Sequence, residues 1–83
     1  MRLDKFLKVS RIIKRRTVAN DACDLGRVKA NGKVVKASYE VKAGDILEIG
    51  FGAKTIKAEI LNVADNVGKA GAAELYRILP QDE

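Results

Sequence analysis

The first sixteen residues concentrate positive charge in a way that points to binding of a polyanion. They hold seven Lys or Arg side chains against a single acid, Asp4, which gives a net charge of +6. Clustered cations neutralise phosphates and release counterions, so such a segment is typical of a nucleic-acid-binding surface. One lysine on a helix is usually only solvated, but the collective charge favours a function. We therefore expect a phosphate-binding face in this segment.

Ten side chains are candidates for contact with the nucleic acid. Arg2, Lys5 and Arg16 are expected to bind phosphates directly. Asp4 is an acid among cations, so we expect it to orient Arg2 or Arg16 through a charge-assisted hydrogen bond, or to accept a hydrogen bond from a ribose hydroxyl. The full set is Arg2, Asp4, Lys5, Lys8, Arg11, Lys14, Arg15, Arg16, Arg27 and Lys29.

Charge is also divided between the two parts of the chain. Residues 1–36 carry eleven basic and three acidic side chains, a net charge of +8, whereas residues 37–83 carry five basic and eight acidic ones, a net charge of −3. A protein that needs charge only for solubility has little reason to segregate the two signs. The N-terminal part is therefore predicted to hold the site, and the acidic part leaves open a second role as a protein-interaction adaptor.

Catalysis and metal binding find little support in the residue types. The chain has no histidine, the common general base at neutral pH, and no recognisable motif pairs two carboxylates. Its one cysteine, Cys23, cannot form an internal disulfide, and the usual zinc-site spacings are absent. We expect no catalytic residue, no metal, no cofactor and no enzymatic activity.

The length of the chain bounds its organisation. A chain of 83 residues has room for one core, so we expect a single domain over 1–83. No apolar run approaches the roughly 18 residues of a membrane span, and no signal peptide is recognisable. We expect a cytoplasmic monomer that does not bind membranes, with a frayed acidic tail over 81–83.

Two short helices must position the cations. An apolar stripe from Leu3 to Leu7 at i, i+3 and i+4 predicts an amphipathic helix with a basic outer face. A second stripe predicts a helix over roughly 15–25 that ends at Gly26, with Cys23 buried on its apolar face rather than reactive. The cations Lys14–Arg16 at its start cost helix stability, but they add to a helix end that attracts anions.

The rest of the chain is predicted to be mostly β. Apolar residues alternate with cations over 28–30 and are followed by Asn31-Gly32, a strong signal for a tight β-hairpin. Strands are predicted over 46–49 and, after a bend between two glycines, over 55–63, and an apolar stripe over 72–79 predicts a short helix. The predicted fold class is α+β, with two N-terminal helices packed on a small antiparallel sheet and a short C-terminal helix.

Base stacking is not expected to dominate binding. The chain has two Phe, two Tyr and no Trp, and Phe6 and Tyr76 lie in core-like patterns. Tyr39 and Phe51 are expected to pack in the core or in loops rather than to stack on single-stranded bases. Recognition of structured RNA through its shape and phosphates fits this composition better.

Several of these segments, in this order and spacing, resemble the RNA-binding domain named after the fourth small-subunit ribosomal protein, also called the alpha-L motif. The matching pieces are Arg2-Leu3-Asp4-Lys5-Phe6-Leu7, Arg16-Thr17-Val18-Ala19, Gly26-Arg27-Val28, Asn31-Gly32 and Gly44-Asp45. The resemblance implies an alpha-L core over 1–49, followed by a C-terminal strand and short helix over 50–79. The compact spacing over Lys14–Arg16 resembles the branch of heat-shock ribosome-binding proteins and bacterial ribosome-associated quality-control factors.

The resemblance implies a function on the large ribosomal subunit. A protein of this branch is expected to bind 23S ribosomal RNA and peptidyl-tRNA on obstructed 50S subunits, beside an elongation factor that adds C-terminal tails to stalled chains. The motif arginines of the family face the RNA, which implies Arg2 and Arg16 as the main contacts. Two alternatives stay open, a heat-shock-type factor that recycles free 50S subunits carrying nascent chains and an RNA-binding module of RNA-modifying enzymes.

Overall fold

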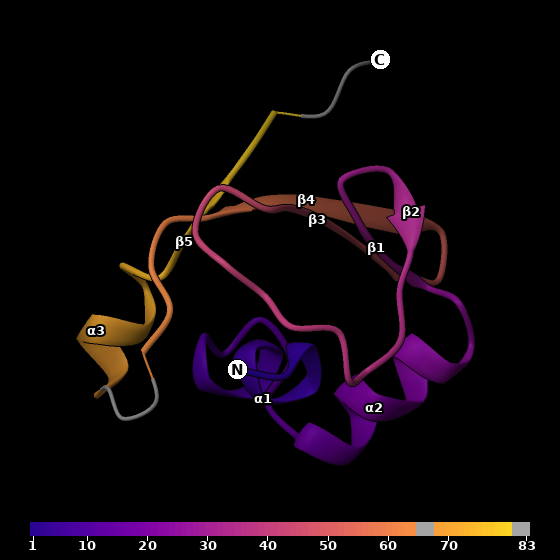
Figure 1. Ribbon diagram of the computed structural model, residues 1–83, viewed down its shortest axis with the longest axis horizontal. Helices are drawn as coiled ribbons and strands as arrows, with labels where there is room; N and C mark the ends of the chain where they lie inside the picture. The colour runs from indigo at the N-terminus through magenta and orange to yellow at the C-terminus, as the bar shows by residue number, and fades with distance from the viewer. Residues whose placement is uncertain (65–67, 81–83) are drawn as a thin grey trace.

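The computed structural model, which describes residues 1–64 and 68–80, contains a five-stranded sheet with helices on one side. The described elements are α1 (Leu3–Val9), α2 (Arg16–Asp24), β1 (Val28–Ala30), β2 (Lys33–Val34), β3 (Ile46–Phe51), β4 (Lys54–Ile60), α3 (Lys69–Ala72) and β5 (Tyr76–Ile78). The strand order is β2-β1-β3-β4-β5, and every neighbouring pair is antiparallel. All three helices lie on the same side of the sheet (Figure 1). The predicted α+β class is confirmed.

Helix α1 is held in place by a segment far along the chain. The backbone N–H groups of Leu3 and Asp4, which have no partner within the helix, donate to the carbonyl oxygens of Tyr39 and Ala37 at 2.8 and 3.2 Å. Val41 N–H donates in turn to the carbonyl of Met1 at 3.0 Å. The segment 37–41 therefore fixes the start of α1, and with it the position of the first motif arginine.

The predicted hairpin is confirmed, and its tip is locked to β3. Asn31 and Gly32 both have positive φ, 54° and 85°, as the favoured two-residue hairpin turn requires. The backbone N–H of Asn31 donates to Ile46 O at 2.8 Å, and its side-chain Oδ1 accepts from Ile46 N–H at 3.0 Å. The buried Asp45 accepts from Asn31 Nδ2 at 3.1 Å, which ties the turn to the start of β3.

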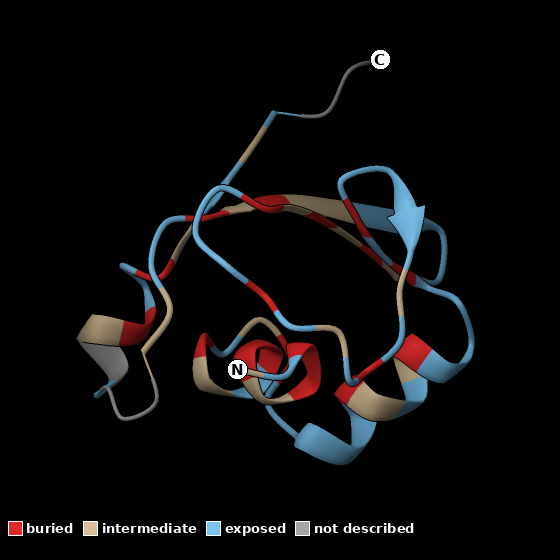
Figure 2. Cartoon of the chain, viewed as in Figure 1, coloured by how far each residue is buried: buried red, intermediate tan, exposed pale blue. Residues whose placement is uncertain are grey.

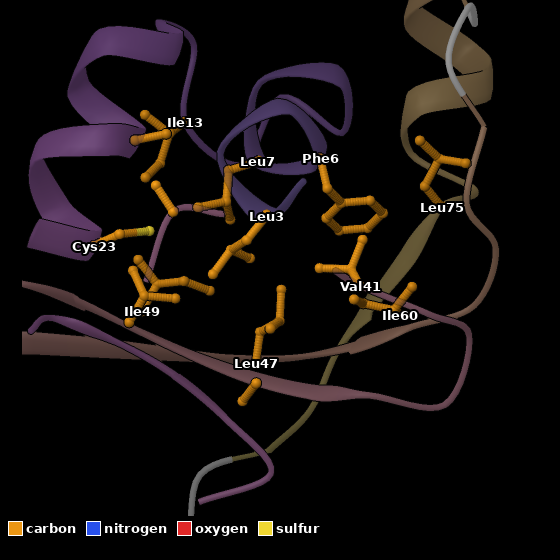
Figure 3. Close-up of a cluster of buried hydrophobic side chains, with 14 residues drawn as sticks. Leu3, Phe6, Leu7, Ile13, Cys23, Val41, Leu47, Ile49, Ile60 and Leu75 are labelled. Carbon is orange, nitrogen blue, oxygen red and sulfur yellow. The ribbon is translucent and has the colours of Figure 1, made fainter. Parts of the chain in front are cut away.

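The core fills the space between the helices and the sheet. Buried residues face one another across this layer (Figure 2), and the close-up in Figure 3 shows side chains of α1 pointing toward strands β3 and β4. Phe6 and Leu7 of α1 and Leu47 of β3 are fully buried. Cys23, on α2, is 3% exposed within the same cluster, so its predicted burial is confirmed. The apolar stripes of both N-terminal helices thus point into one core.

The aromatic side chains pack as predicted wherever the structure describes them. Phe6 lies in the core, and Tyr39 and Tyr76 are half-buried against it. The Tyr39 hydroxyl donates to Asp45 Oδ2 at 2.9 Å, and burial together with this bond raises the pKa of Tyr39. The side chain of Phe51 lies outside the described residues, as does the tail over 81–83.

A short C-terminal helix is present, but its predicted position over 72–79 is wrong. Helical residues occur over Lys69–Ala72, but Tyr76–Ile78 form β5 and pair with β4, with Ala58 opposite Ile78. Residues of this stripe match a helical period, yet β4 would otherwise present an open edge of unpaired backbone groups. Pairing with that edge outweighs the local pattern. None of the helices described over 1–64 and 68–80 has the length and apolar character needed to cross a membrane.

The two central strands also differ from their predicted bounds. Strand β3 continues to Phe51 through Gly50, which was predicted to begin a bend, and β4 ends at Ile60 rather than at 63. Gly50 N–H donates to Arg27 O at 2.8 Å, so it stays in hydrogen-bonding contact with the chain before β1. The turn falls at Gly52, where φ is 58°.

Candidate nucleic-acid interface

One buried carboxylate joins the start of α1 to α2. Asp4 has a side chain only 4% exposed, and its Oδ1 accepts from Arg2 Nε at 3.2 Å. Arg16 Nε lies 3.4 Å from the other oxygen, Oδ2, and Asn20 Nδ2 donates to that oxygen at 3.4 Å. The predicted orientation of a motif arginine by Asp4 is confirmed, and it applies to both arginines. We call Arg2, Asp4, Arg16 and Asn20 the Asp4 cluster.

The helices explain why these four side chains meet. Arg16 and Asn20 are four residues apart on α2, so they lie on the same face of that helix. Ala19 and Cys23 lie on the neighbouring face of α2 and are buried in the core, so α2 packs against α1. Asn20 was not among the candidates from the sequence. Its i+4 spacing from Arg16 could have indicated that the two side chains share a face of α2. The spacing does not identify Asp4 as the partner of Asn20, because that contact forms only when α1 and α2 pack together.

The electrostatics of the cluster favour a charged Asp4. Burial by itself would raise the pKa of Asp4, but hydrogen bonds from Arg2, Asn20, Arg16 and the Lys5 backbone N–H outweigh burial and hold this pKa below its ordinary value. A charged carboxylate reduces the repulsion between the two guanidinium groups. The arginine side chains remain 52% and 47% exposed. Each guanidinium has five N–H donors, so donors remain for a phosphate.

This shift makes the stability of the fold depend on pH. Because the pKa of Asp4 is lower in the folded state, the cluster stabilises the fold above about pH 4, the unfolded value, and the stabilisation is lost as pH falls through the folded value. Asp4→Asn is expected to lower the free energy of unfolding at pH 7 by about 1–3 kcal/mol. The difference from the wild type should shrink below pH 4 in thermal melts followed by circular dichroism. A difference that is constant from pH 7 to pH 2 would contradict this.

The other cations of the N-terminal segment are accessible to solvent. Lys8, Arg11, Lys14 and Arg15 are exposed, and Lys5 is half-buried on α1. Arg15 precedes the first helical residue of α2 with extended backbone, and no side chain caps the helix there. The first backbone N–H groups of α2 therefore have no capping side chain as acceptor, and three cations, Lys14–Arg16, lie next to them in the sequence. A phosphate would meet both kinds of donor at this helix end.

An open hollow lies beside the cluster. Its volume is about 320 Å³, and it is lined by Asp4, Arg16, Thr17, Asn20 and Asp21. The lining combines a guanidinium, an amide and a hydroxyl with two carboxylates, so it offers donors for a phosphate and acceptors for hydroxyl groups. Thr17 and Asp21 line this hollow but were not among the RNA-binding residues predicted from the sequence.

Two of the candidate cations lie away from the cluster. Lys29 is exposed between buried Val28 and Ala30, so its side chain points to the sheet face opposite the helices. Arg27 lines a second hollow of about 310 Å³ between α2 and the turn that joins β3 to β4. The structure thus brings Arg2, Asp4 and Arg16 into contact, whereas Lys29 lies on the opposite face of the sheet and Arg27 lines a separate hollow.

Comparison with known proteins yields several similarities. The model of the S4 domain family matches residues 1–47. The chain is 52% identical over 82 residues to the RQC P-site tRNA stabilizing factor of Halalkalibacterium halodurans, covering 99% of this chain and 93% of that protein. It is 48% identical over 83 residues to the protein of the same name from Bacillus subtilis, covering 100% and 96%. A solved trimeric structure of Vibrio cholerae Heat Shock Protein 15 matches with a TM-score of 0.87 at 31% identity, covering 95% of this chain and 81% of that one.

Proposed function

The chain belongs to the S4 domain family, as its motifs predicted, and on that premise we propose that it is a non-enzymatic RNA-binding factor of the large ribosomal subunit. The observation that carries the proposal is the Asp4 cluster. A buried carboxylate holds two half-exposed arginines in fixed orientations, in the part of the chain with a net charge of +8. The charge supplies attraction to phosphates, and the cluster supplies a defined geometry.

Fixed arginines bind RNA better than free ones for a thermodynamic reason. A mobile arginine loses rotamer freedom when it binds, which costs roughly 0.5–1.5 kcal/mol for each immobilised side chain. Arg2 and Arg16 have already lost part of that freedom in the ion pairs with Asp4. The surrounding lysines add attraction that needs no fixed geometry. Recognition of structured RNA through its phosphates follows from such a surface.

The names of the full-length relatives support a more specific role. They are described as P-site tRNA stabilizing factors, and coverage of both chains is nearly complete. We therefore propose that this protein contacts 23S ribosomal RNA and peptidyl-tRNA on obstructed 50S subunits. There it would support the elongation factor that adds C-terminal tails to stalled chains. Binding as a monomer stays a prediction, because the similar heat-shock protein is described as trimeric.

The structural similarity to that heat-shock protein favours one second candidate, a factor that recycles free 50S subunits carrying nascent chains. The tailing role and the recycling role differ in whether C-terminal extension depends on the protein. A tailing factor is needed for C-terminal extension of stalled chains, whereas a recycling factor is not. Tail extension in cells that lack the protein therefore separates the two.

Salt dependence gives a direct test of RNA binding. If residues 2–16 neutralise about four to six phosphates, the logarithm of the association constant should fall with the logarithm of salt concentration with a slope of about −3 to −5. The measurement is filter binding of purified 23S ribosomal RNA between 50 and about 300 mM salt. Arg16→Glu should weaken binding far more than Lys57→Glu, because Lys57 lies opposite Glu48 on the sheet face away from the helices.

Two outcomes would argue against this interface. A slope near zero would remove the electrostatic basis of the proposal and would favour the adaptor role of the acidic part. Equal effects of the two charge reversals would place the RNA on another face of the protein.

A further inference from the structure

Each of the two N-terminal helices is followed by a residue with positive φ. At the end of α2, Gly26 has a φ of 73°, and its N–H donates to Cys23 O at 3.0 Å. The next N–H, that of Arg27, donates to Ala22 O at 3.0 Å. This is the left-handed helix cap in which glycine is the usual residue, because a Cβ makes the conformation costly.

At the end of α1 the same position is occupied by an arginine. Arg11 has a φ of 64°, and its N–H donates to Lys8 O at 3.0 Å, the same three-residue step that Gly26 makes. The second bond runs from Ile13 N–H to Leu7 O at 3.1 Å and spans six residues, one more than the bond from Arg27 to Ala22. The chain therefore uses glycine at one left-handed cap and arginine at the other.

An arginine in this conformation is unusual within the molecule. Across residues 1–64 and 68–80, the other non-glycine residue with positive φ is Asn31, a type that tolerates the left-handed region. Arg11 has no such tolerance. Its backbone is nevertheless held firmly, because the buried Ser10 donates its hydroxyl to Leu7 O at 3.3 Å and Ile13 is buried in the core.

The Arg11 side chain itself makes no contact that would offset this strain within the described residues. The Arg11 side chain is exposed, and in the part of the chain that the structure describes it makes no hydrogen bond and no ion pair. A left-handed non-glycine residue persists where the surrounding structure imposes it, and such residues cluster at functional sites. The turn that carries Arg11 leads directly into the exposed cations Lys14–Arg16 at the start of α2.

We infer that Arg11 contacts RNA from a helix-cap position that is usually occupied by glycine. The left-handed backbone at this position lowers the stability of the fold, but it holds the arginine on a rigid turn beside the RNA. The inference rests on the proposed function. An arginine gains from such a position because its planar group binds a phosphate through two parallel hydrogen bonds, and a rigid backbone limits the freedom lost on binding.

The inference predicts opposite effects of one substitution on stability and on binding. Arg11→Gly should raise the Tm by about 4 °C, because it relieves the left-handed strain in a domain of this size. The same variant should bind purified 23S ribosomal RNA about five- to tenfold more weakly, with a salt slope smaller by about one. Arg11→Asn, which also tolerates the left-handed region, should change both quantities in the same directions without adding glycine flexibility.

Two further variants serve as controls. Arg11→Lys keeps the charge and the strain, so its Tm should equal that of the wild type and its affinity should fall between those of wild type and Arg11→Gly. Lys42→Asn removes an exposed cation outside the basic segment and should leave Tm and affinity unchanged.

The outcomes separate this inference from the proposed function. If the wild type binds with a steep salt slope but Arg11→Gly and Arg11→Asn bind as tightly, Arg11 makes no RNA contact and the inference is wrong. If neither variant gains stability, no trade of stability for binding exists, and the inference is equally wrong. If the wild type shows no salt-dependent binding at all, the proposed function itself fails.

Discussion

Replacing Arg2 and Arg16 together by alanine is expected to release the protein from 50S subunits that carry peptidyl-tRNA. Each arginine contact with phosphate is worth about 1–3 kcal/mol, so losing both should weaken binding by about a hundredfold or more. The wild-type protein should sediment with these 50S particles in a sucrose gradient, and the variant should stay at the top. In cells that lack the protein, the variant should also fail to restore C-terminal extension of a non-stop reporter.

The double variant has a structural side effect that its control must separate. Both arginines are hydrogen-bonded to Asp4, so their removal leaves a buried carboxylate that still accepts from Asn20 Nδ2 and the Lys5 N–H. A buried charge that loses partners destabilises a fold. Adding Asp4→Asn to the double variant removes that charge and should recover part of the stability without recovering binding.

A second control matches the change in net charge. Lys42→Ala combined with Lys54→Ala also removes two exposed cations, but outside the basic segment, and should leave sedimentation and tail extension unchanged. Full restoration of tailing by the Arg2→Ala, Arg16→Ala variant would overturn the quality-control assignment. Wild-type protein that sediments only at the top of the gradient would overturn binding to the subunit.

Replacing Cys23 by aspartate is expected to unfold much of the protein. Cys23 is 3% exposed, and burial, with smaller effects from the charges of Asp4 and Asp24, raises the pKa of its thiol to about 11. A carboxylate at this position would be buried close to two existing negative charges. The cost is about 3–5 kcal/mol, a large fraction of the roughly 5–15 kcal/mol by which a domain is stable.

Alanine at the same position gives the matched comparison. Cys23→Ala removes one buried sulfur and should cost about 1 kcal/mol while leaving RNA binding intact. Urea denaturation followed by circular dichroism measures both variants. Wild-type stability of Cys23→Asp would mean that this face of α2 is exposed, in conflict with the packing of α2 against α1.

The elements that the sequence predicts well are those specified by local signals. The apolar stripe of α1, the glycine that ends α2 and the Asn31-Gly32 turn each act within a few residues, so no knowledge of distant segments is needed. Strand β5 lacks such a signal. It forms because β4 offers an open edge, and that edge exists only after the sheet has assembled.

The site shows the same division between local and distant information. An ion pair of Asp4 with one motif arginine, Arg2 or Arg16, was predicted from charge and motif, whereas the structure shows Asp4 paired with both. Asn20 joins the cluster only because α1 and α2 pack together, which the sequence does not specify residue by residue. Lys29, in contrast, could have been assigned to the solvent face of the sheet, because side chains in a strand alternate between two faces.

The anchoring of α1 by the segment 37–41 has a consequence for the order of events during synthesis. The N–H groups of Leu3 and Asp4 find their acceptors only after Tyr39 has left the ribosomal exit tunnel. A nascent chain that ends before Ala37 therefore carries every cation of the first sixteen residues but lacks the backbone hydrogen bonds that fix the start of α1. Cotranslational folding of the basic surface must wait for this long-range closure, so the nascent protein acquires its shape-specific affinity for RNA later than its charge.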